Sequence, residues 1–316
     1  MMNTFVKNII FVAIVMLVAV SAAYYVTQVD TGEDNVLNVT RDDLEGEKIV
    51  HTSVRNGFKQ IYITEISSGD QVALTDNFHE DQQPNWAHDN DKIAFISNRS
   101  GHKEVHIMNS DGNNVRQVTE MKAVCDYPAF SPDGQKIAFT AWENERKDIY
   151  VIDIDGSNLK KLTEAERKVH NEYPSWSPDG DKIIYRSNEG LNADVYIMND
   201  EGENREALTS NLHYDGGYAD WSPDGKTVVF TSYKNENKEL YLMEEDGENI
   251  RRLTENKIYD GFPAWSNDGR YITFIRYDNR YQRTDYAEIH VMDVKSREVE
   301  QITDDLNQDI HPDWIN

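Results

Sequence analysis

The chain has 316 residues, and its 57 Asp and Glu against 32 Lys and Arg give a formal net charge of −25. This length predicts one large domain or two small ones. Because a polyanion is repelled by nucleic-acid phosphates, we expect no nucleic-acid binding. The single cysteine, Cys125, cannot form an internal disulfide and is interpreted as inert packing, and the spacing of Cys and His predicts no structural zinc site.

The amino-terminal segment differs from the rest of the chain, because residues 8–28 carry no charged side chain and follow Lys7. One interpretation is a signal peptide cleaved after Ala22 or Ala23, and the other is an uncleaved anchor about twenty residues long. The length of the uncharged stretch favours the anchor. In both cases the positive-inside rule places the remainder outside the cytoplasm, in the periplasm or at the cell surface. We therefore divide the chain into an export segment at 1–27, an acidic tether at 28–46 and a domain at 47–316.

A short motif that ends in an aromatic residue recurs every 44 to 49 residues along this domain. Its copies are Pro84-Asn85-Trp86, Pro128-Ala129-Phe130, Pro174-Ser175-Trp176, Ala219-Asp220-Trp221, Pro263-Ala264-Trp265 and Pro312-Asp313-Trp314. A turn follows, for example Ser131-Pro132-Asp133-Gly134, in which Pro fixes φ, Asp bonds its own backbone and Gly takes the left-handed conformation. A fixed period of this length predicts a repeat architecture.

Each repeat contains four short strands. Alternating apolar runs such as 136–140 and 148–152 have the period of two that is typical of strands, and a short strand ending in Leu162-Thr163 or its equivalent closes the unit. Such units are the blades of a β-propeller. Because the chain enters the first unit at Lys48 in a second strand and ends at 311–316 in a lone first strand, we predict an all-β, six-bladed propeller of four-stranded antiparallel blades. The carboxy-terminal strand completes blade 1 and removes exposed sheet edges.

The repeat also carries an Ile137-Ala138-Phe139 strand, an Ile149-Tyr150 strand, an Asp155-Gly156 turn and Leu162-Thr163. In these residues the sequence resembles the TolB-type propeller over positions 47–316. The α/β domain that precedes the propeller in the full TolB protein has no counterpart in residues 28–46. The resemblance implies an exported propeller whose role is binding.

The two faces of such a propeller differ. Loops between blades, and loops between second and third strands, emerge on one face, which we call the loop face; the two tight hairpins emerge on the other, the turn face. The loop face varies more from blade to blade, so we place binding there. The candidate partner-binding residues in its interblade connections are His79, Asp81, Asp126, His170, Glu172, His213, Asp215, Tyr259, Asp260, Asp309 and His311.

The recurring carboxylates of this face have two interpretations. They are either solvated caps of the interblade loops or a ring at the channel mouth that attracts a cationic partner or a cation. Oxygen ligands suit Ca²⁺, for which Asp215, Asp220, Asp260 and Asp313 are the candidates. No other cofactor is expected.

Blade 6 has an insertion at 277–286 that contains Arg280, Tyr281 and Arg283. These residue types dominate binding energy at interfaces, so the insertion is either a contact loop or a loop folded back on its own blade. Three histidines, His51, His106 and His290, occupy strand positions that hold Phe or Tyr in other blades, and we expect them in the core.

Common enzyme motifs are missing from the sequence, including Gly-x-Ser-x-Gly, the phosphate loop and His-Glu-x-x-His. We therefore predict a monomeric, non-enzymatic binding scaffold outside the cytoplasm, which presents its loop face to a protein or an extracellular polymer and meets the membrane only through its amino-terminal segment. The alternative is a metal-assisted propeller enzyme of the carbohydrate lyase or lactonase type, with its site at the channel mouth.

Overall fold

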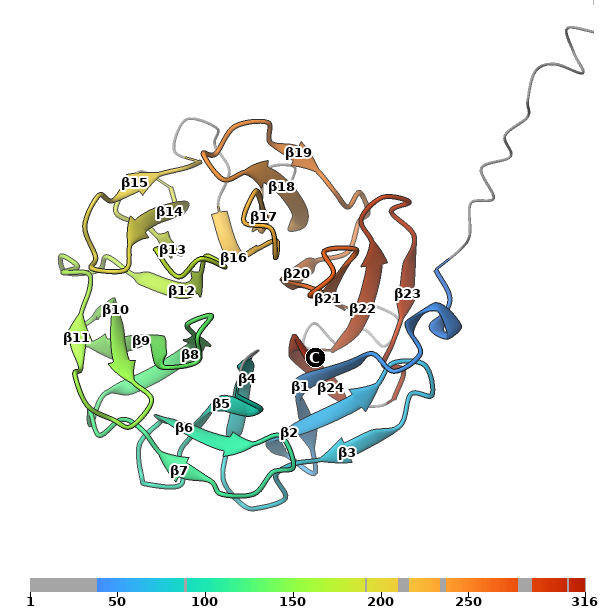
Figure 1. Ribbon diagram of the computed structural model, residues 1–316, viewed down its shortest axis with the longest axis horizontal. Helices are drawn as coiled ribbons and strands as arrows, with labels where there is room; N and C mark the ends of the chain where they lie inside the picture. The colour runs from blue at the N-terminus through green and yellow to red at the C-terminus, as the bar shows by residue number, and fades with distance from the viewer. Residues whose placement is uncertain are drawn as a thin grey trace, which may run out of the picture. The chain divides into compact units, whose positions relative to one another are not determined.

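A computed structural model describes residues 39–87, 90–190, 192–209, 216–233, 237–277, 286–305 and 307–315. Within these ranges the strands form six four-stranded antiparallel sheets arranged in a ring (Figure 1). The predicted all-β, six-bladed propeller is confirmed. Across the same ranges, no helix is long and apolar enough to cross a bilayer. The proposed export segment lies outside the described residues.

The blades are numbered in chain order, and their strands are given from the channel outward. Blade 1 contains β24 (Gln308–Ile315), β1 (Lys48–Arg55), β2 (Phe58–Glu65) and β3 (Gln71–Ala73). Blade 2 contains β4 (Asp81–Ala87), β5 (Lys92–Ser97), β6 (Glu104–Asn109) and β7 (Arg116–Gln117). Blade 3 contains β8 (Val124–Phe130), β9 (Lys136–Glu143), β10 (Arg146–Asp153) and β11 (Lys160–Lys161).

The other three blades follow the same order. Blade 4 contains β12 (Asn171–Trp176), β13 (Lys182–Ser187), β14 (Asp194–Asn199) and β15 (Glu206–Ala207). Blade 5 contains β16 (Gly216–Trp221), β17 (Thr227–Ser232), β18 (Glu239–Glu244) and β19 (Arg251–Arg252). Blade 6 contains β20 (Asp260–Trp265), β21 (Tyr271–Tyr277), β22 (Ala287–Asp293) and β23 (Val299–Gln301).

The ring closes at blade 1, where the last strand of the chain pairs with the first. β24 runs antiparallel to β1, with Trp314 opposite Ile49. Trp314 is only 1% exposed, and its indole N–H donates to the carbonyl oxygen of Ala264 in blade 6 at 3.0 Å. β24 therefore joins blade 1 by hydrogen bonds and blade 6 by packing, as the sequence predicts.

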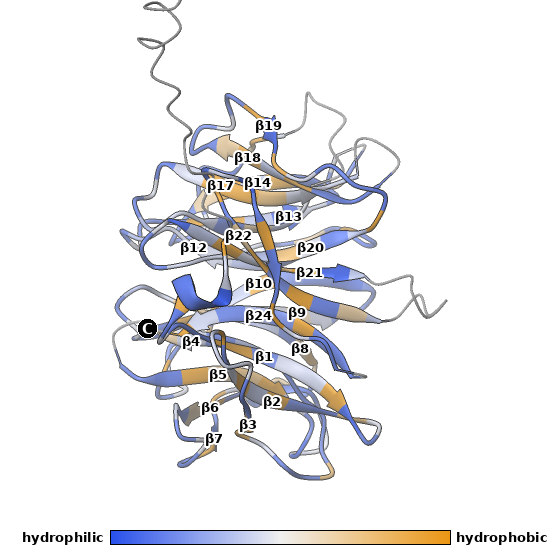
Figure 2. Ribbon diagram, turned by 90° about the vertical axis from the view of Figure 1, so that its right-hand side faces the viewer, coloured by the Kyte–Doolittle hydropathy of each residue, from blue (hydrophilic) through white to orange (hydrophobic). Residues whose placement is uncertain are grey.

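Apolar side chains fill the space between neighbouring blades. Val50 and Ile61 of blade 1 pack with Trp86, Phe95 and Met108 of blade 2, and the other interblade layers are built in the same way. Apolar residues follow the strands through the ring, whereas the connecting loops are mainly hydrophilic (Figure 2). Burial of these layers is the main favourable contribution to folding.

The recurring Leu-Thr of each repeat fastens the outermost strand. The hydroxyl of Thr163 accepts the N–H of Ile149 at 2.9 Å and donates to the carboxylate of Asp148 at 2.8 Å. The same acid and threonine pair occurs in blades 2, 4, 5 and 6 as Glu104 with Thr119, Asp194 with Thr209, Glu239 with Thr254 and Glu288 with Thr303. These carboxylates therefore serve the fold.

The residues just before β1 also pack on the propeller. Arg41–Leu44 form a short 3₁₀ helix, η1, and Leu44 is completely buried in the apolar layer between blades 6 and 1. The Arg41 guanidinium donates to the carbonyl oxygens of Gln301 at 2.9 Å and Ile302 at 2.8 Å. The part of the proposed tether that the structure describes, residues 39–46, is thus attached to blade 6.

Candidate functional site

The inner strands carry a β-bulge at the loop-face end of the channel. In blade 2 the register between β4 and β5 shifts between Gln82 and Asn85, and Gln83 has a φ of 57°. Bulges redirect a side chain, and here the residue before the Pro of the repeat lines the channel. The equivalent residues are Gln83, Tyr127, Tyr173, Tyr218, Phe262 and His311, and all but Tyr218 have a positive φ.

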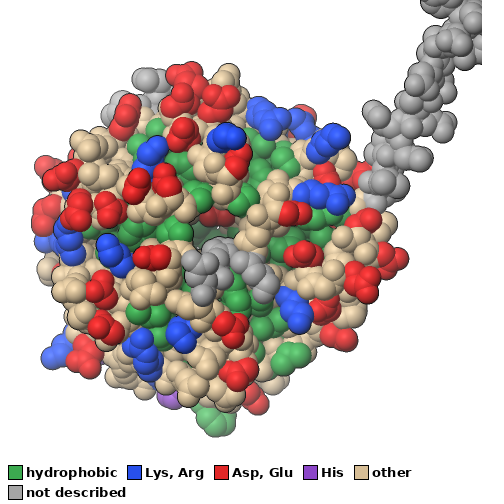
Figure 3. All heavy atoms as spheres, viewed as in Figure 1, with side chains coloured by type: hydrophobic (Ala, Val, Ile, Leu, Met, Phe, Trp, Pro, Cys, Tyr) green, Lys and Arg blue, Asp and Glu red, His purple; other side chains and the backbone are tan. Residues whose placement is uncertain are grey.

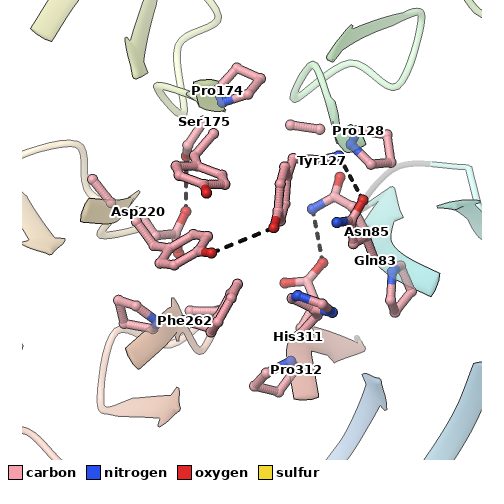
Figure 4. Close-up of a pocket in the computed structure, with 18 residues that line it drawn as sticks. Gln83, Asn85, Tyr127, Pro128, Pro174, Ser175, Asp220, Phe262, His311 and Pro312 are labelled. Carbon is pink, nitrogen blue, oxygen red and sulfur yellow. Dashed lines mark hydrogen bonds between the residues drawn. The ribbon is translucent and has the colours of Figure 1, made fainter. Parts of the chain in front are cut away.

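Five of these side chains, Tyr127, Tyr173, Tyr218, Phe262 and His311, form a layer that we call the aromatic floor (Figure 4). Neighbouring ring centroids lie between 3.6 and 4.5 Å apart along the series Tyr127, Tyr173, Tyr218, Phe262 and His311. The floor, its prolines and the next residues of the inner strands line a cavity of about 140 Å³. Burial raises the pKa of Tyr127 and Tyr218 well above the ordinary value, so these phenols stay neutral.

Asp220 and Asp313 line the channel below the floor, as predicted, but both carboxylates are engaged by neighbouring blades. Asp313 accepts the backbone N–H of Trp86 at 2.7 Å, and Asp220 accepts that of Trp265 at 2.9 Å. Burial raises the pKa of each to about 6. In the described ranges no three His, Cys, Asp or Glu side chains come together as a metal site. Asp215, the third candidate ligand, lies outside them.

The carboxylates that begin the inner strands point into the protein. Asp81, Asp260 and Asp309 are completely buried, which differs from the solvated loop caps that the sequence suggested. Arg276 makes two hydrogen bonds to Asp260, at 2.8 and 3.0 Å, and Arg99 makes two to Asp81. Glu172 pairs with both Lys147 and Arg186. Asp81, Glu172 and Asp260 are internal counter-ions and Asp309 is buried, so the described part of the mouth has no ring of solvent-exposed carboxylates.

Four lysines surround the floor instead. Lys59, Lys103, Lys147 and Lys238 occupy equivalent positions, each immediately before a polar residue near the start of a third strand, which is Gln60, Glu104, Asp148 and Glu239 in turn. Each side chain extends to the start of the next blade: Lys59 donates to Gln82 at 2.8 Å, Lys103 is 3.9 Å from Asp126, Lys147 pairs with Glu172 and Lys238 donates to the Tyr259 hydroxyl at 3.2 Å. We call this set the lysine rim.

Three exposed aromatic side chains lie on the loop face, in different blades. Phe78, in the connection from blade 1 to blade 2, is 87% exposed. Trp142, at the end of β9, is 49% exposed, and Tyr233, after β17, is 50% exposed. No aromatic side chain among the described residues of the turn face reaches such exposure. Asp and Glu are spread widely over the outer part of the ring in the view of Figure 3.

The remaining predicted residues have separate positions. His79 is exposed, and its carbonyl oxygen accepts a hydrogen bond from Gln60, whereas His170 is half-buried and donates its backbone N–H to Asn188. His213, Asp215, Arg280, Tyr281 and Arg283 lie outside the described residues. The core positions of His51, His106 and His290 are confirmed. Cys125 is also buried, which raises its pKa and leaves it without nucleophilic character.

Titration of His311 provides a test of the aromatic floor. Burial, together with the charges of Lys59 and Lys103, lowers the pKa of His311 from 6.5 to about 3. Because only the unfolded chain then gains a proton below pH 6.5, His311 destabilises the fold as the pH falls, by about 2 kcal/mol at pH 5. In urea denaturation, the free energy of unfolding of His311→Phe, which copies Phe262, should rise relative to that of the wild type by about this much as the pH falls from about 7.5 to about 5. A difference that stays constant with pH would contradict a neutral, buried His311.

Comparisons with known proteins identify the repeat. Residues 12–124 and 114–219 match a family model described as the TolB beta propeller domain. The solved TolB from Acinetobacter baumannii is 18% identical, with a TM-score of 0.73 over 86% of this chain and 67% of that one. A putative TolB from Agrobacterium tumefaciens is 20% identical, with a TM-score of 0.68 over 83% of this chain and 91% of that one.

An oligogalacturonate lyase from Vibrio parahaemolyticus is 12% identical, with a TM-score of 0.58 over 84% of this chain and 75% of that one. No curated protein matches the chain. At these identities the solved structures share the fold, and they do not by themselves assign an activity.

Proposed function

Because the chain belongs to the TolB β-propeller family, we propose that it is a non-enzymatic binding scaffold outside the cytoplasm, which presents its loop face to a protein partner. The observation that carries this proposal is that the three strongly exposed aromatic side chains among the described residues, Phe78, Trp142 and Tyr233, all lie on that face. Aromatic anchors supply most of the energy of protein interfaces, and charged groups around them select the partner.

The chemistry of the channel mouth supports recognition more than catalysis. A general acid or base needs a pKa near the working pH and a position within reach of a substrate. At the floor, His311 is held neutral and Tyr127 and Tyr218 keep their protons. The nearby acids Asp81 and Asp260 are bound by arginines. Asp220 and Asp313 have a pKa raised to about 6, but each already accepts a backbone N–H of a neighbouring blade. These groups are suited to hold a ligand in place.

The extracytoplasmic location rests on the sequence of residues 8–28. An uncharged stretch of this length behind Lys7 directs the following chain across the membrane, whether the segment is cleaved or kept as an anchor.

A second candidate is a lyase that acts on an acidic carbohydrate at the channel mouth. It is supported by the likeness to the oligogalacturonate lyase fold and by the lysine rim, since ammonium groups attract uronate carboxylates. Cleavage of oligogalacturonate by the purified protein, with and without added Ca²⁺ or Mn²⁺, would favour this candidate.

A pull-down from separated envelope and cytoplasmic fractions tests the proposed scaffold. We expect the wild-type protein to capture a partner from the envelope fraction, and the double variant Trp142→Ala with Tyr233→Ala to lose about tenfold or more in affinity. Leu159→Ala is the matched control, because Leu159 is 48% exposed on the turn face and Trp142 is 49% exposed. A partner that the double variant retains and Leu159→Ala loses would refute the assignment of the loop face, and capture from the cytoplasmic fraction alone would refute the location.

A further inference from the structure

Within the lysine rim, the charges of Lys59 and Lys103 are incompletely paired with carboxylates of the described residues. Among the described residues, no carboxylate makes an ion pair with Lys59, whose ammonium group donates only to the neutral Gln82. Lys103 is 3.9 Å from Asp126, and its side chain is 36% exposed. Burial lowers the pKa of Lys59, the charge of Lys103 adds to this effect, and the carboxylates of Glu80 and Asp126 offset only part of it. This sector of the loop face, at blades 1 and 2, therefore holds positive charge that the fold does not fully neutralise.

The same sector contains an unused polar atom at the channel mouth. His311 lines the cavity beside Gln83 and Tyr127, and its Nδ1 is buried without a hydrogen-bond partner in the described part of the chain (Figure 4). A neutral imidazole can offer one N–H donor. The cavity of about 140 Å³ has room for a side chain, and a buried polar atom without a partner gains from a ligand that supplies one.

An exposed apolar contact lies at the start of the strand that carries Lys59. Phe58, the residue before Lys59, meets Phe78 edge to face with ring centroids 5.9 Å apart, and Phe78 is 87% exposed. The loop that carries Phe78 is fixed by Gln60, which donates to the carbonyl oxygens of Asn77 and His79. An exposed aromatic ring held in this way is a typical anchor for a partner segment.

We propose that the channel mouth beside Lys59 and Lys103 binds an aspartate or glutamate side chain, carried on an extended segment of a partner protein that also contacts Phe78. The inference deepens the proposed scaffold function and rests on it. Lys59 and Lys103 supply the charge, and the imidazole of His311 can complete the hydrogen bonds of the carboxylate.

A short acidic peptide fits these observations better than an acidic polysaccharide. The rings of the aromatic floor pack on one another, with Tyr218 and Phe262 centroids 3.6 Å apart, so they present little flat surface on which a sugar could stack. The net charge of −25 also repels a long polyanion, whereas a single carboxylate in contact with two lysines is attracted locally.

The test measures binding of short fluorescent peptides to the full chain by anisotropy. The probes are mixed-sequence peptides with a central Asp or Glu next to a leucine, the same peptides with Asn or Gln, and oligogalacturonate as competitor. We expect the acidic peptides to bind roughly tenfold more tightly than their amides, and Lys59→Met with Lys103→Met to abolish this preference. Lys226→Met, which removes an exposed lysine of the turn face, should keep it.

Lys103→Met alone provides a second variant, because its side chain is partly exposed and its loss should reduce the preference without unfolding the protein. Equal binding of acidic and amide peptides, or an unchanged preference in the lysine variants, would overturn the inference. If oligogalacturonate displaces every labelled peptide at a lower concentration than the unlabelled peptide does, the ligand of this site is an acidic polymer and not a peptide. If Trp142→Ala with Tyr233→Ala abolishes partner capture while Lys59→Met leaves it intact, the scaffold function stands and this inference fails.

Discussion

Deletion of residues 311–316 should abolish the cooperative unfolding transition of the propeller. These residues contain Trp314 and Ile315, which are 1% and 8% exposed, and Asp313, which accepts the backbone N–H of Trp86 in blade 2. Burial of each large apolar side chain stabilises the fold by about 1.5 to 3 kcal/mol, and each buried backbone group left unpaired costs about 1 to 3 kcal/mol. The sum approaches the ~5 to 15 kcal/mol that stabilise a whole domain. Urea denaturation followed by circular dichroism measures this loss.

Point variants separate closure from a general effect of truncation. Trp314→Ala should lower the free energy of unfolding by about 3 to 5 kcal/mol, because it empties a buried site between blades 6 and 1. Trp142→Ala, at a side chain that is 49% exposed, should change it by less than about 0.5 kcal/mol. A truncated chain that unfolds at the same urea concentration as the full-length chain would contradict a ring closed by β24.

The fold could be predicted because a buried aromatic side chain recurs at the same place of the inner strand in each repeat. In two blades it also donates its indole N–H to the preceding blade, from Trp176 to Ala129 and from Trp314 to Ala264. A residue that must fill the same space in every blade recurs at a fixed spacing in the sequence. The turn that follows is equally local: Asp133 accepts the N–H of Gln135 at 3.0 Å, and Gly134 has a φ of 63°.

The carboxylates of the loop face were harder to interpret because their partners do not recur at one position. Asp81 is bound by Arg99, which follows β5, whereas Asp260 is bound by Arg276, which lies within β21. Glu172 is bound by Lys147 of the preceding blade and by Arg186, which stands opposite it in β13 as Arg276 stands opposite Asp260 in β21. Aligned repeats therefore show the acid in every blade but the base at one position in only two of them. The fold brings these pairs together, so the sequence left solvated loop caps and a ring at the channel mouth as the two interpretations.

The residues of the aromatic floor and the lysine rim each occupy a fixed position in the repeat. The floor residue always precedes the Pro or Ala of the repeat motif, as Tyr127 precedes Pro128. Each rim lysine precedes a polar residue near the start of a third strand, as Lys147 precedes Asp148. The direction of the floor side chains depends on the bulge in each inner strand, because a regular strand would direct them differently. The spacing of the repeat does not reveal a bulge.

Asp260 and Asp309 occupy equivalent places in neighbouring blades, but their surroundings differ. Asp260 accepts two hydrogen bonds from Arg276 and one from Asn256 at 2.7 Å. In the described ranges neither oxygen of Asp309 has a hydrogen-bond partner, and Nδ1 of His51 lies 3.6 Å away. Burial lowers the pKa of His51, so this ring is neutral at pH 7. Both side chains are completely buried. The same substitution should therefore have opposite effects at the two sites.

Asp260→Asn should lower the free energy of unfolding by about 2 to 4 kcal/mol, because it leaves the Arg276 guanidinium beside a neutral amide. Asp309→Asn should leave stability unchanged or raise it by about 1 kcal/mol, because it removes a buried carboxylate that has no donors of its own. Urea denaturation of the two variants at neutral pH provides the comparison, and each is the control for the other. Equal destabilisation would mean that Asp309 has a cationic or donor partner comparable to Arg276. If Asp260→Asn leaves the free energy of unfolding unchanged, Arg276 is equally well solvated without the carboxylate, and the acids of the loop face contribute little to the stability of the inner strands.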